Sequence, residues 1–247
     1  MPLSRLDRKS SALFCGTLGD MTAASIRARV RAEMTDEIKA VARRHLATDG
    51  ANLSLRAVAR DLGMASSAVY RYFASRDELL TALIIDAYDA VGAAAEQAVD
   101  PSAGFLDRFL AVCHAVRDWA LANPHEWALI YGSPVPGYQA PTDTVGPAIR
   151  VILLIGAIVR DAVLAGGVDI GEPIAGKLGD ELRVVAEQAA QGAPPQAVAR
   201  SLAAWIHMCG AINAELFGQL NNTIDQRREF FDFQMRGAAT LIGFRQV

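Results

Sequence analysis

The segment Ala65–Phe73 carries hydroxyl groups at spacings suited to hydrogen bonding outward from one face of a helix. Helical periodicity turns Val69 inward and leaves Ser66, Ser67 and Tyr70 exposed. Serine hydroxyls bond base edges or phosphates, and tyrosine commonly bonds phosphates. The segment therefore predicts a surface that reads nucleic acid.

Signals on both sides place this segment in a helix-turn-helix. Ser54 can cap a preceding helix by accepting from a free backbone N–H, and Gly63 can end that helix at positive φ. Ser75 can cap the following helix, whose first turn is acidic. Two short helices joined by a glycine-containing turn form a helix-turn-helix, and its second helix lies in the major groove of DNA. The expected inward positions are Leu55, Val58, Ala59, Leu62, Val69 and Phe73.

This stretch resembles the N-terminal domain of TetR-family transcriptional regulators. The resemblance spans Thr35–Gly50, Leu55–Phe73 and the tail Ala68–Leu80 (AVYRYFASRDELL), which is the most specific part. It implies an all-α fold, in which an N-terminal three-helix helix-turn-helix DNA-binding domain precedes a larger helical ligand-binding and dimerisation domain. We expect a disordered or arm-like leader at 1–30, the DNA-binding domain at 31–80 and the effector-binding and dimerisation domain at 81–247.

The resemblance also implies which side chains contact DNA. Arg56 would reach a base or a nearby phosphate, and Ser66 and Ser67 would contact base edges. Tyr70 would bind a phosphate, and Arg76 would hold one after the recognition helix. Tyr72 would pack at or touch the DNA backbone, with core packing as the alternative.

Charge is unevenly divided along the chain, although the net value is only −3. Residues 1–80 hold 13 Lys and Arg against 9 Asp and Glu, whereas residues 81–247 hold 11 against 18. This division suits a small DNA-binding head on an acidic body that binds a ligand or a partner. The longest apolar run, 151–159, is far shorter than the roughly 20 residues that cross a bilayer, so no membrane span is expected.

The three cysteines, Cys15, Cys113 and Cys209, are too few and too scattered for a disulfide framework. They indicate reduced thiols in the cytoplasm. No Cys/His cluster has the spacing of zinc ligands, so neither a metal nor a cofactor is expected. Residues 1–20 are interpreted as a disordered leader, with Met21 as an alternative start.

Residues 25–34 (SIRARVRAEM) alternate arginines with small or apolar residues just before the first expected helix. One interpretation is an arm in which Arg27, Arg29 and Arg31 add phosphate or minor-groove contacts. The other, which we favour, is an early helical turn with a solvated basic face. In both cases the charges would lie near DNA.

The C-terminal part resembles one TetR subfamily, whose C-terminal domain has a Trp-His-Gly signature. Trp205, Gly210 and Glu215–Gly218 fit this pattern, but Cys209 stands at the histidine position and His207 lies two residues early. The resemblance implies that 196–220 and 223–242 form a four-helix homodimer interface with the same helices of a second copy. A dimer reads two half-sites, so we expect a near-palindromic double-stranded DNA operator. The alternative is that these helices only close the monomer core.

Helical periodicity and Pro or Gly breaks predict the other elements. We expect helices at 35–48, 75–99, 102–122, 124–131, 144–165, 172–191, 196–220 and 223–242, a loop at 132–142, and no strand.

The body is expected to hold a pocket between its long helices. The lack of many buried charges predicts a small apolar or weakly polar effector, whose binding would change the spacing of two heads and release DNA. Repression is the default in the family, so a ligand-responsive repressor is implied. The candidate lining residues are Phe105, Phe109, Trp119, Trp127, Tyr131, Ile152, Ile155 and Trp205.

Two other function classes stay open. A helical enzyme would need inward carboxylates or His/Glu pairs, but the sequence has no Glu-x-x-His or His-Glu-x-x-His, and we interpret His114 and Asp118 as a structural pair. A helical adaptor or ligand-binding protein with a vestigial DNA-binding head would carry acids at the groove-facing positions. Because Ser66, Ser67 and Tyr70 are not acids, DNA binding is favoured.

Overall fold

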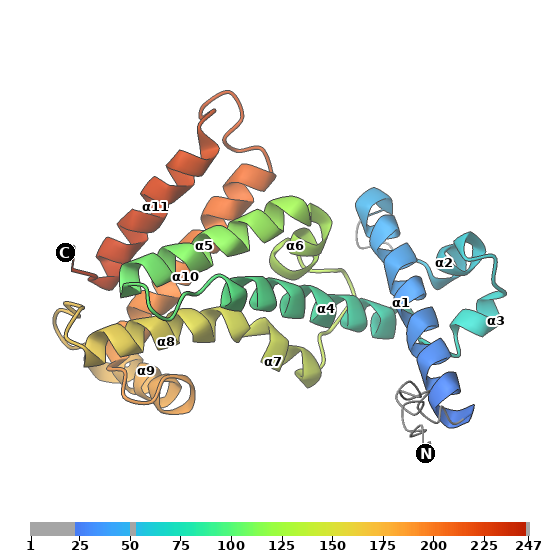
Figure 1. The fold of residues 1–247 in the computed structure, drawn as a ribbon, viewed down its shortest axis with the longest axis horizontal. Helices are drawn as coiled ribbons and strands as arrows, with labels where there is room; N and C mark the ends of the chain where they lie inside the picture. Colours follow the sequence, from blue (N-terminus) through green and yellow to red (C-terminus); the bar gives the residue numbers. More distant parts are fainter. Residues whose placement is uncertain (1–22, 50–52, 246–247) are drawn as a thin grey trace, which may run out of the picture.

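The computed structural model describes residues 23–49 and 53–245, and this part of the chain folds into eleven α-helices and one 3₁₀ helix (Figure 1). The elements are α1 (Ala23–Asp49), α2 (Leu55–Asp61), α3 (Ser66–Val69), α4 (Arg76–Gln97), α5 (Phe105–Ala122), α6 (Pro124–Tyr131), η1 (Thr142–Thr144), α7 (Val145–Ala148), α8 (Arg150–Leu164), α9 (Gly176–Ala189), α10 (Pro195–Leu216) and α11 (Arg227–Ile242). The expected all-α fold is confirmed.

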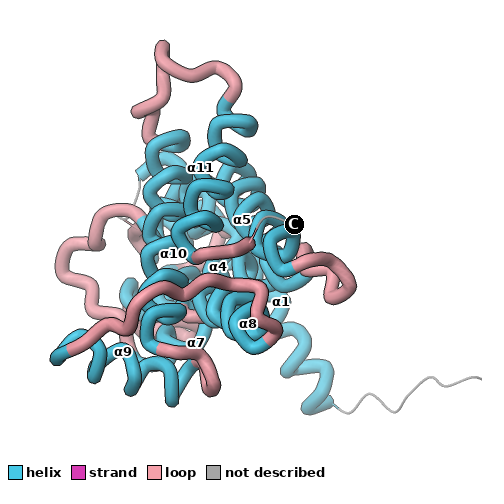
Figure 2. Tube along the Cα trace, turned by 90° about the vertical axis from the view of Figure 1, so that its left-hand side faces the viewer, coloured by secondary structure: helices cyan, strands magenta, loops and turns pink. Residues whose placement is uncertain are grey.

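A small head and a larger body share helix α4. Figure 1 shows α1 to α3 at one end of the long axis, with α4 running from them into the bundle of α5 to α11. The end-on view in Figure 2 shows the body helices gathered around α4. The head core takes Leu79, Leu80 and Leu83 from α4, and the body core takes Val91 and Ala95 from the same helix. Helix α4 therefore crosses the boundary that we predicted at residue 80.

Local signals fix the helix ends of the head as expected. The Ser54 hydroxyl accepts from the Ala57 amide at 3.4 Å, and the Ser75 hydroxyl accepts from the Glu78 amide at 3.1 Å. Gly63 adopts φ +65° directly after α2, the left-handed conformation that glycine tolerates without a Cβ clash. These caps set the turn between α2 and α3 and the entry into α4.

Several predicted boundaries are wrong. Helix α5 begins at Phe105 and not at 102, α10 ends at Leu216 and not at 220, and α11 begins at Arg227 and not at 223. Residues 23–30, expected in the leader, form the start of α1, because nothing in this stretch breaks a helix. The helical interpretation that we favoured for residues 25–34 is therefore confirmed, and the arm is not.

The helix predicted at 144–165 is divided into α7 and α8 at Ile149, whose φ of −92° and ψ of −2° depart from regular helix geometry. Helix α9 begins at Gly176 and not at residue 172, after the left-handed Gly171 and Pro173. The leader expected at 1–20 lies outside the described residues.

Neither a strand nor a membrane-crossing helix is present in the described ranges. Backbone pairing outside helices is limited there to one isolated bridge between Val168 and Phe244. Each described helix is too short or too polar to span a bilayer. The described His, Cys, Asp and Glu side chains also form no group of three that could hold a metal ion.

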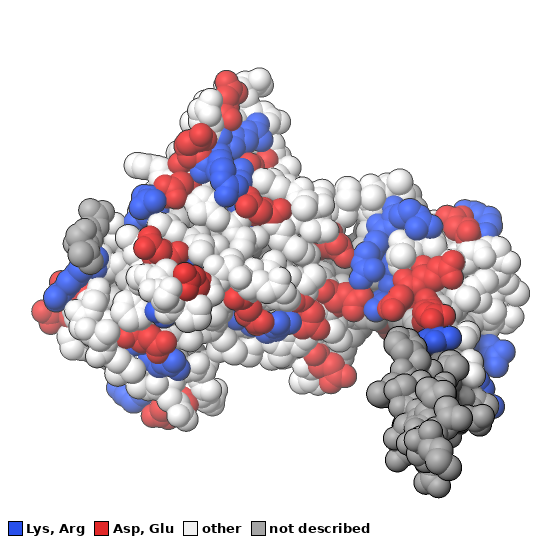
Figure 3. Space-filling model, viewed as in Figure 1, with Lys and Arg blue, Asp and Glu red and all other residues white. Residues whose placement is uncertain are grey.

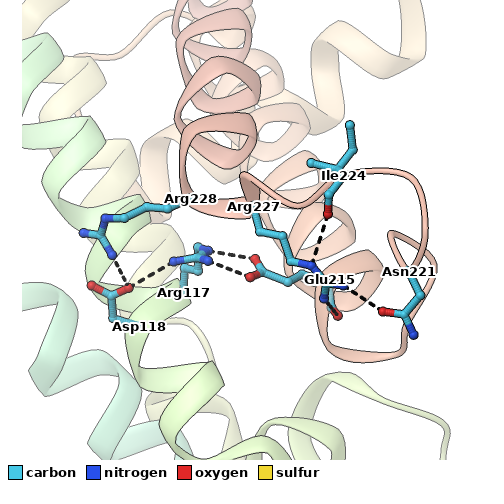
Figure 4. A network of polar contacts seen from close by, with 7 residues as sticks. All are labelled: Arg117, Asp118, Glu215, Asn221, Ile224, Arg227 and Arg228. Carbon is cyan, nitrogen blue, oxygen red and sulfur yellow. Dashed lines mark hydrogen bonds and ion pairs between the residues drawn. The ribbon is translucent and has the colours of Figure 1, made fainter.

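A buried ion pair links α5 to α10 inside the body (Figure 4). The Arg117 guanidinium donates to both carboxylate oxygens of Glu215, at 2.8 and 2.6 Å, and both residues are less than 10% exposed. Asp118, on the surface beside it, accepts from Arg117 and from Arg228 on α11. His114 pairs with Asp232 on α11 at 3.0 Å, so the predicted pair of His114 with Asp118 is wrong.

We expect Glu215→Ala to destabilise the protein by about 3–5 kcal/mol, because it leaves the Arg117 charge buried without its partner. Asp118→Ala, which removes an exposed partner of the same arginine, should cost about 1 kcal/mol or less. Urea unfolding followed by circular dichroism measures both changes. A loss below 1 kcal/mol for Glu215→Ala would contradict the assignment of this pair as a buried anchor.

Candidate nucleic-acid interface

The recognition segment consists of α3 and the turns that follow it. Helix α3 spans only Ser66–Val69, but the Tyr70 amide bonds to the Ser66 carbonyl at 3.2 Å and the Phe73 amide bonds to the Val69 carbonyl at 3.1 Å. The chain thus keeps turning as far as Phe73. Val69 and Phe73 are buried in the head core, and their burial fixes which face of the segment points outward.

That outward face carries the predicted contact residues. Ser67 is exposed, Ser66 is half-buried at the first position of α3, and Tyr70 is 45% exposed although it is aromatic. A large aromatic side chain with a polar end that stays in solvent is suited to contact a partner surface. The structure therefore brings Ser66, Ser67 and Tyr70 together on one face of the head.

The other predicted contact residues lie around this face. Arg56 is exposed in the first turn of α2. Arg76 opens α4, is partly exposed and contacts Asp77 at 3.3 Å. Tyr72 is half-buried and packs against the head core, which is the alternative that the sequence left open for it. Its role as a DNA contact stays a prediction.

A contact missed by sequence reasoning joins α1 to the end of the recognition segment. The Arg31 guanidinium donates to the Arg71 carbonyl at 3.1 Å and lies over the Tyr72 ring, 5.0 Å from its centroid. Residues forty apart in the sequence carry no local signal for such a pairing. The contact places α1 beside the surface formed by Ser67 and Tyr70.

Ion pairs fasten the head to the body. Arg43 on α1 bonds Asp86 on α4 at 2.6 Å and Glu126 on α6 at 2.8 Å. Lys39, one turn earlier, also contacts Asp86 at 2.9 Å. Burial opposes the charge of Lys39, but hydrogen bonds to Asp86 and Asp36 outweigh it and raise the pKa of the ammonium. Because these charges sit on three helices, the orientation of the head depends on α4 and α6.

The body contains an apolar cavity of about 230 Å³ between α8, α9 and α10. Its lining includes no charged side chain, and the one hydroxyl, that of Ser201, is already bonded to the Ala197 carbonyl. The other residues of the wall are Ile149, Ile152, Leu153, Gly156, Val185, Ala189, Ala190, Ala193, Ala197, Val198 and Leu202.

Ile152 is the one member of the predicted pocket that lines this cavity. The other seven lie in or against the main body core, and Phe109, Trp127 and Ile155 are completely buried there. Their large side chains fill the centre of the bundle, so the space is left where smaller residues meet. The four remaining predicted pocket residues pack against the edge of the body core and are partly buried: Phe105, Trp119, Tyr131 and Trp205.

Helix α8 is bound to α4 by Arg150, which lies between the cavity residues Ile149 and Ile152 in the sequence. The Arg150 guanidinium bonds Asp89 at 2.7 Å and both oxygens of Glu96, at 3.0 and 2.7 Å. It lies over Gly92, where an added Cβ would come within 2.9 Å of the Arg150 Nε. The hydrogen bonds from Arg150 lower the pKa of Glu96. Arg150 follows Ile149 and precedes Ile152, so a cavity wall is joined to the helix that carries the head.

Sequence comparisons identify the fold family. Residues 38–83 match a model described as bacterial regulatory proteins of the tetR family, and residues 109–238 match a tetracyclin repressor-like C-terminal domain. The HTH-type transcriptional regulators Rv1816 of Mycobacterium tuberculosis and Mb1846 of Mycobacterium bovis are each 39% identical over 194 residues, which cover 76% of this chain and 83% of theirs. The chain belongs to the TetR family.

Solved structures agree with this assignment. The regulatory protein SCO4313 superposes with a TM-score of 0.72 at 34% identity, over 87% of this chain and 98% of that one. RolR, solved in complex with resorcinol, has the same fold, with a TM-score of 0.50 at 16% identity over 87% and 94% of the two chains. This TetR-family protein is a DNA-binding transcriptional regulator of a family that consists of regulators and not of enzymes. Its Trp-His-Gly subfamily stays a prediction.

Ser67→Asp should abolish sequence-specific DNA binding, because the new carboxylate would face the negatively charged duplex. Tyr70→Ala should weaken binding by about tenfold, which corresponds to the loss of one hydrogen bond to a charged group. Electrophoretic mobility shift against an in vitro selected operator measures both effects. Ser133→Asp introduces the same charge in the exposed loop after α6 and should bind normally. Parental binding by both head variants would show that the recognition segment is misplaced.

Proposed function

We propose that this protein is a ligand-responsive repressor that binds a near-palindromic operator in the cytoplasm as a homodimer. The observation that supports it most is the exposed face of Ser66, Ser67 and Tyr70 on a capped and buried recognition segment. None of the positions on this face is acidic, so the alternative of an adaptor with a vestigial head is less well supported. The six predicted contacts, Arg56, Ser66, Ser67, Tyr70, Tyr72 and Arg76, belong to this proposal.

Charge on the head supports specific rather than general affinity for nucleic acid. In the view of Figure 3, basic and acidic side chains are mixed over both head and body. Lys39 and Arg43 are already paired with carboxylates. Few phosphate contacts per head would give modest affinity, so two heads on one operator would be needed for tight binding.

Exposed apolar stripes on α10 and α11 support the dimer. Ile206 is 61% exposed and Phe233 is 72% exposed, and both lie on helices that pack against each other. One turn after each of them comes a glycine, Gly210 or Gly237, at which an added Cβ would meet no atom within 4 Å. Glycines that open onto solvent between exposed apolar side chains let a second pair of helices approach closely. A second copy of α10 and α11 would bury this surface in a four-helix interface.

Phe233→Glu should therefore convert the dimer to a monomer of 26.4 kDa and weaken operator binding by about 100-fold, since the second head no longer binds at high effective concentration. Sedimentation equilibrium and DNA titration measure the two effects. The control is Leu164→Glu, which changes a leucine of similar exposure, 69%, at the end of α8. It should leave the dimer and the operator affinity unchanged. A Phe233→Glu variant that stays dimeric would rule out this interface.

We further propose that the cavity between α8, α9 and α10 holds the effector. Its wall has no charge and one hydroxyl that is already bonded, so it suits a small neutral apolar or weakly polar molecule. RolR holds resorcinol, a small aromatic molecule, within the same fold. A ligand that wedges α8 away from α10 would act on α4 through Arg150 and shift the population toward heads that are wrongly spaced for DNA.

Naphthalene is a suitable neutral probe of this cavity. It should raise the thermal midpoint of the parent protein by about 3 °C near saturation, as binding to the folded state alone stabilises it. Gly156→Leu should abolish that shift, because Gly156 lines the cavity and an added Cβ there meets no atom within 4 Å. Leucine favours helix over glycine, so the variant should stay folded. An equal shift in both proteins would place the naphthalene elsewhere.

A further inference from the structure

We propose that the N-terminal extension of α1, residues 25–34, is a second DNA-contacting surface, in which Arg27 binds phosphates beside the half-site read by Ser67 and Tyr70. This inference rests on the proposed DNA-binding function and adds an element outside the helix-turn-helix. It assigns a role to the arginine-rich stretch that the sequence singled out.

Helix α1 extends well beyond the core that it helps to form. Residues 25–33 are all exposed, and packing against the head begins at Met34 and Ile38. Figure 1 and Figure 2 both show the N-terminal end of α1 projecting past the rest of the molecule, beside α3 in Figure 1. Nine exposed helical residues gain little stability from burial, so the extension is suited to a role that needs a partner.

The helical period sorts the three arginines of this extension onto two faces. Arg27 and Arg31 are four residues apart and continue the stripe of Met34 and Ile38, which faces the head core. Arg29 lies on the opposite face and forms an ion pair with Glu33 at 3.4 Å. Arg27 and Arg31 therefore point to the side of α1 on which the recognition segment lies.

The contacts of Arg31 show that this side of α1 lies against the end of the recognition segment. Its guanidinium bonds the Arg71 carbonyl and lies over the Tyr72 ring, directly after Tyr70 in the recognition segment. Arg31 thus braces the extension against the surface that faces DNA.

Arg27 lies on the same face of α1 as Arg31, one helical turn toward the N-terminus. The rise along the helix axis between the two residues is about 6 Å. No ion pair joins Arg27 to any described residue. Lys39 and Arg43, further toward the C-terminal end of α1, are instead paired with Asp86 and Glu126. A shift of about 6 Å corresponds to roughly two phosphates along one DNA strand, which are spaced about 3.4 Å apart along the axis. An exposed guanidinium without a carboxylate at this place is complementary to the flanking backbone, where it adds affinity without reading sequence.

The test uses Arg27→Ala in the full chain, with Arg29→Ala as the matched control on the opposite face. Alanine is a strong helix former, so neither change should unwind α1. The DNA is a duplex that the parent protein selects from a random library, prepared with long flanks and with flanks trimmed to the recognised sequence. Fluorescence anisotropy gives the affinity of each protein between 50 and 200 mM salt.

Arg27→Ala should bind the long duplex about tenfold more weakly at 50 mM salt and nearly as well as the parent at 200 mM. The loss of one phosphate contact per protomer lowers the salt slope of a dimer by about two. Trimming the flanks should weaken the parent and Arg29→Ala but leave Arg27→Ala unchanged, and the selected sequence should stay the same for all three.

Equal affinity, salt slope and flank dependence in Arg27→Ala and the parent would overturn this inference. If Ser67→Asp still abolishes binding in that case, the proposed DNA-binding function stands without the extension. If the parent selects no sequence from the library, the proposed function fails and this inference fails with it.

Discussion

Helix α4 is the constraint on which the rest of the structure depends, because its two ends belong to two different cores. Its 22 residues span roughly 33 Å, from the Ser75 cap in the head to Gln97 in the body. Leu80 and Leu83 are buried with the recognition segment, and Val91 and Ala95 are buried in the core of the body. A movement of the body that shifts α4 must therefore also shift the head.

Ion pairs on both sides of α4 turn this continuity into a defined geometry. Arg43 ties α4 and α6 to α1 near the head, and Arg150 ties α4 to α8 near the cavity. Gly92 lets the Arg150 guanidinium lie close to the backbone of α4. Partly exposed pairs such as these contribute modest stability, so their main effect is on register and orientation. Contacts that cost little free energy to break would suit the two-state regulator proposed above.

Sequence alone predicted the parts of the site that are encoded locally. Ser54, Gly63 and Ser75 mark helix ends through their own backbone preferences, and the period of Val69 and Phe73 fixes the outward face of Ser67 and Tyr70. Pairings between distant segments carry no such signal, which is why the contacts of Arg31, Arg43 and Arg150 were missed.

The apolar cavity between α8, α9 and α10 was mispredicted for a different reason. Large aromatic residues such as Phe109 and Trp127 suggest a pocket wall, but in a close-packed bundle they fill the centre completely. Space remains where small residues such as Gly156 on α8 and Ala197 on α10 meet on neighbouring helices. Which small residues meet depends on the packing of α8, α9 and α10, and the pattern of any one helix does not contain that information.

The central claim is that two copies of this head read one operator. The most direct test is a fluorescence-anisotropy titration of the full chain against the DNA upstream of its own gene, with a scrambled duplex of equal composition and a salt series. Tight binding to the first duplex only, saturating at two protomers per site, is the predicted result. Equal and salt-labile binding to both duplexes would contradict sequence reading by the segment that carries Ser67 and Tyr70.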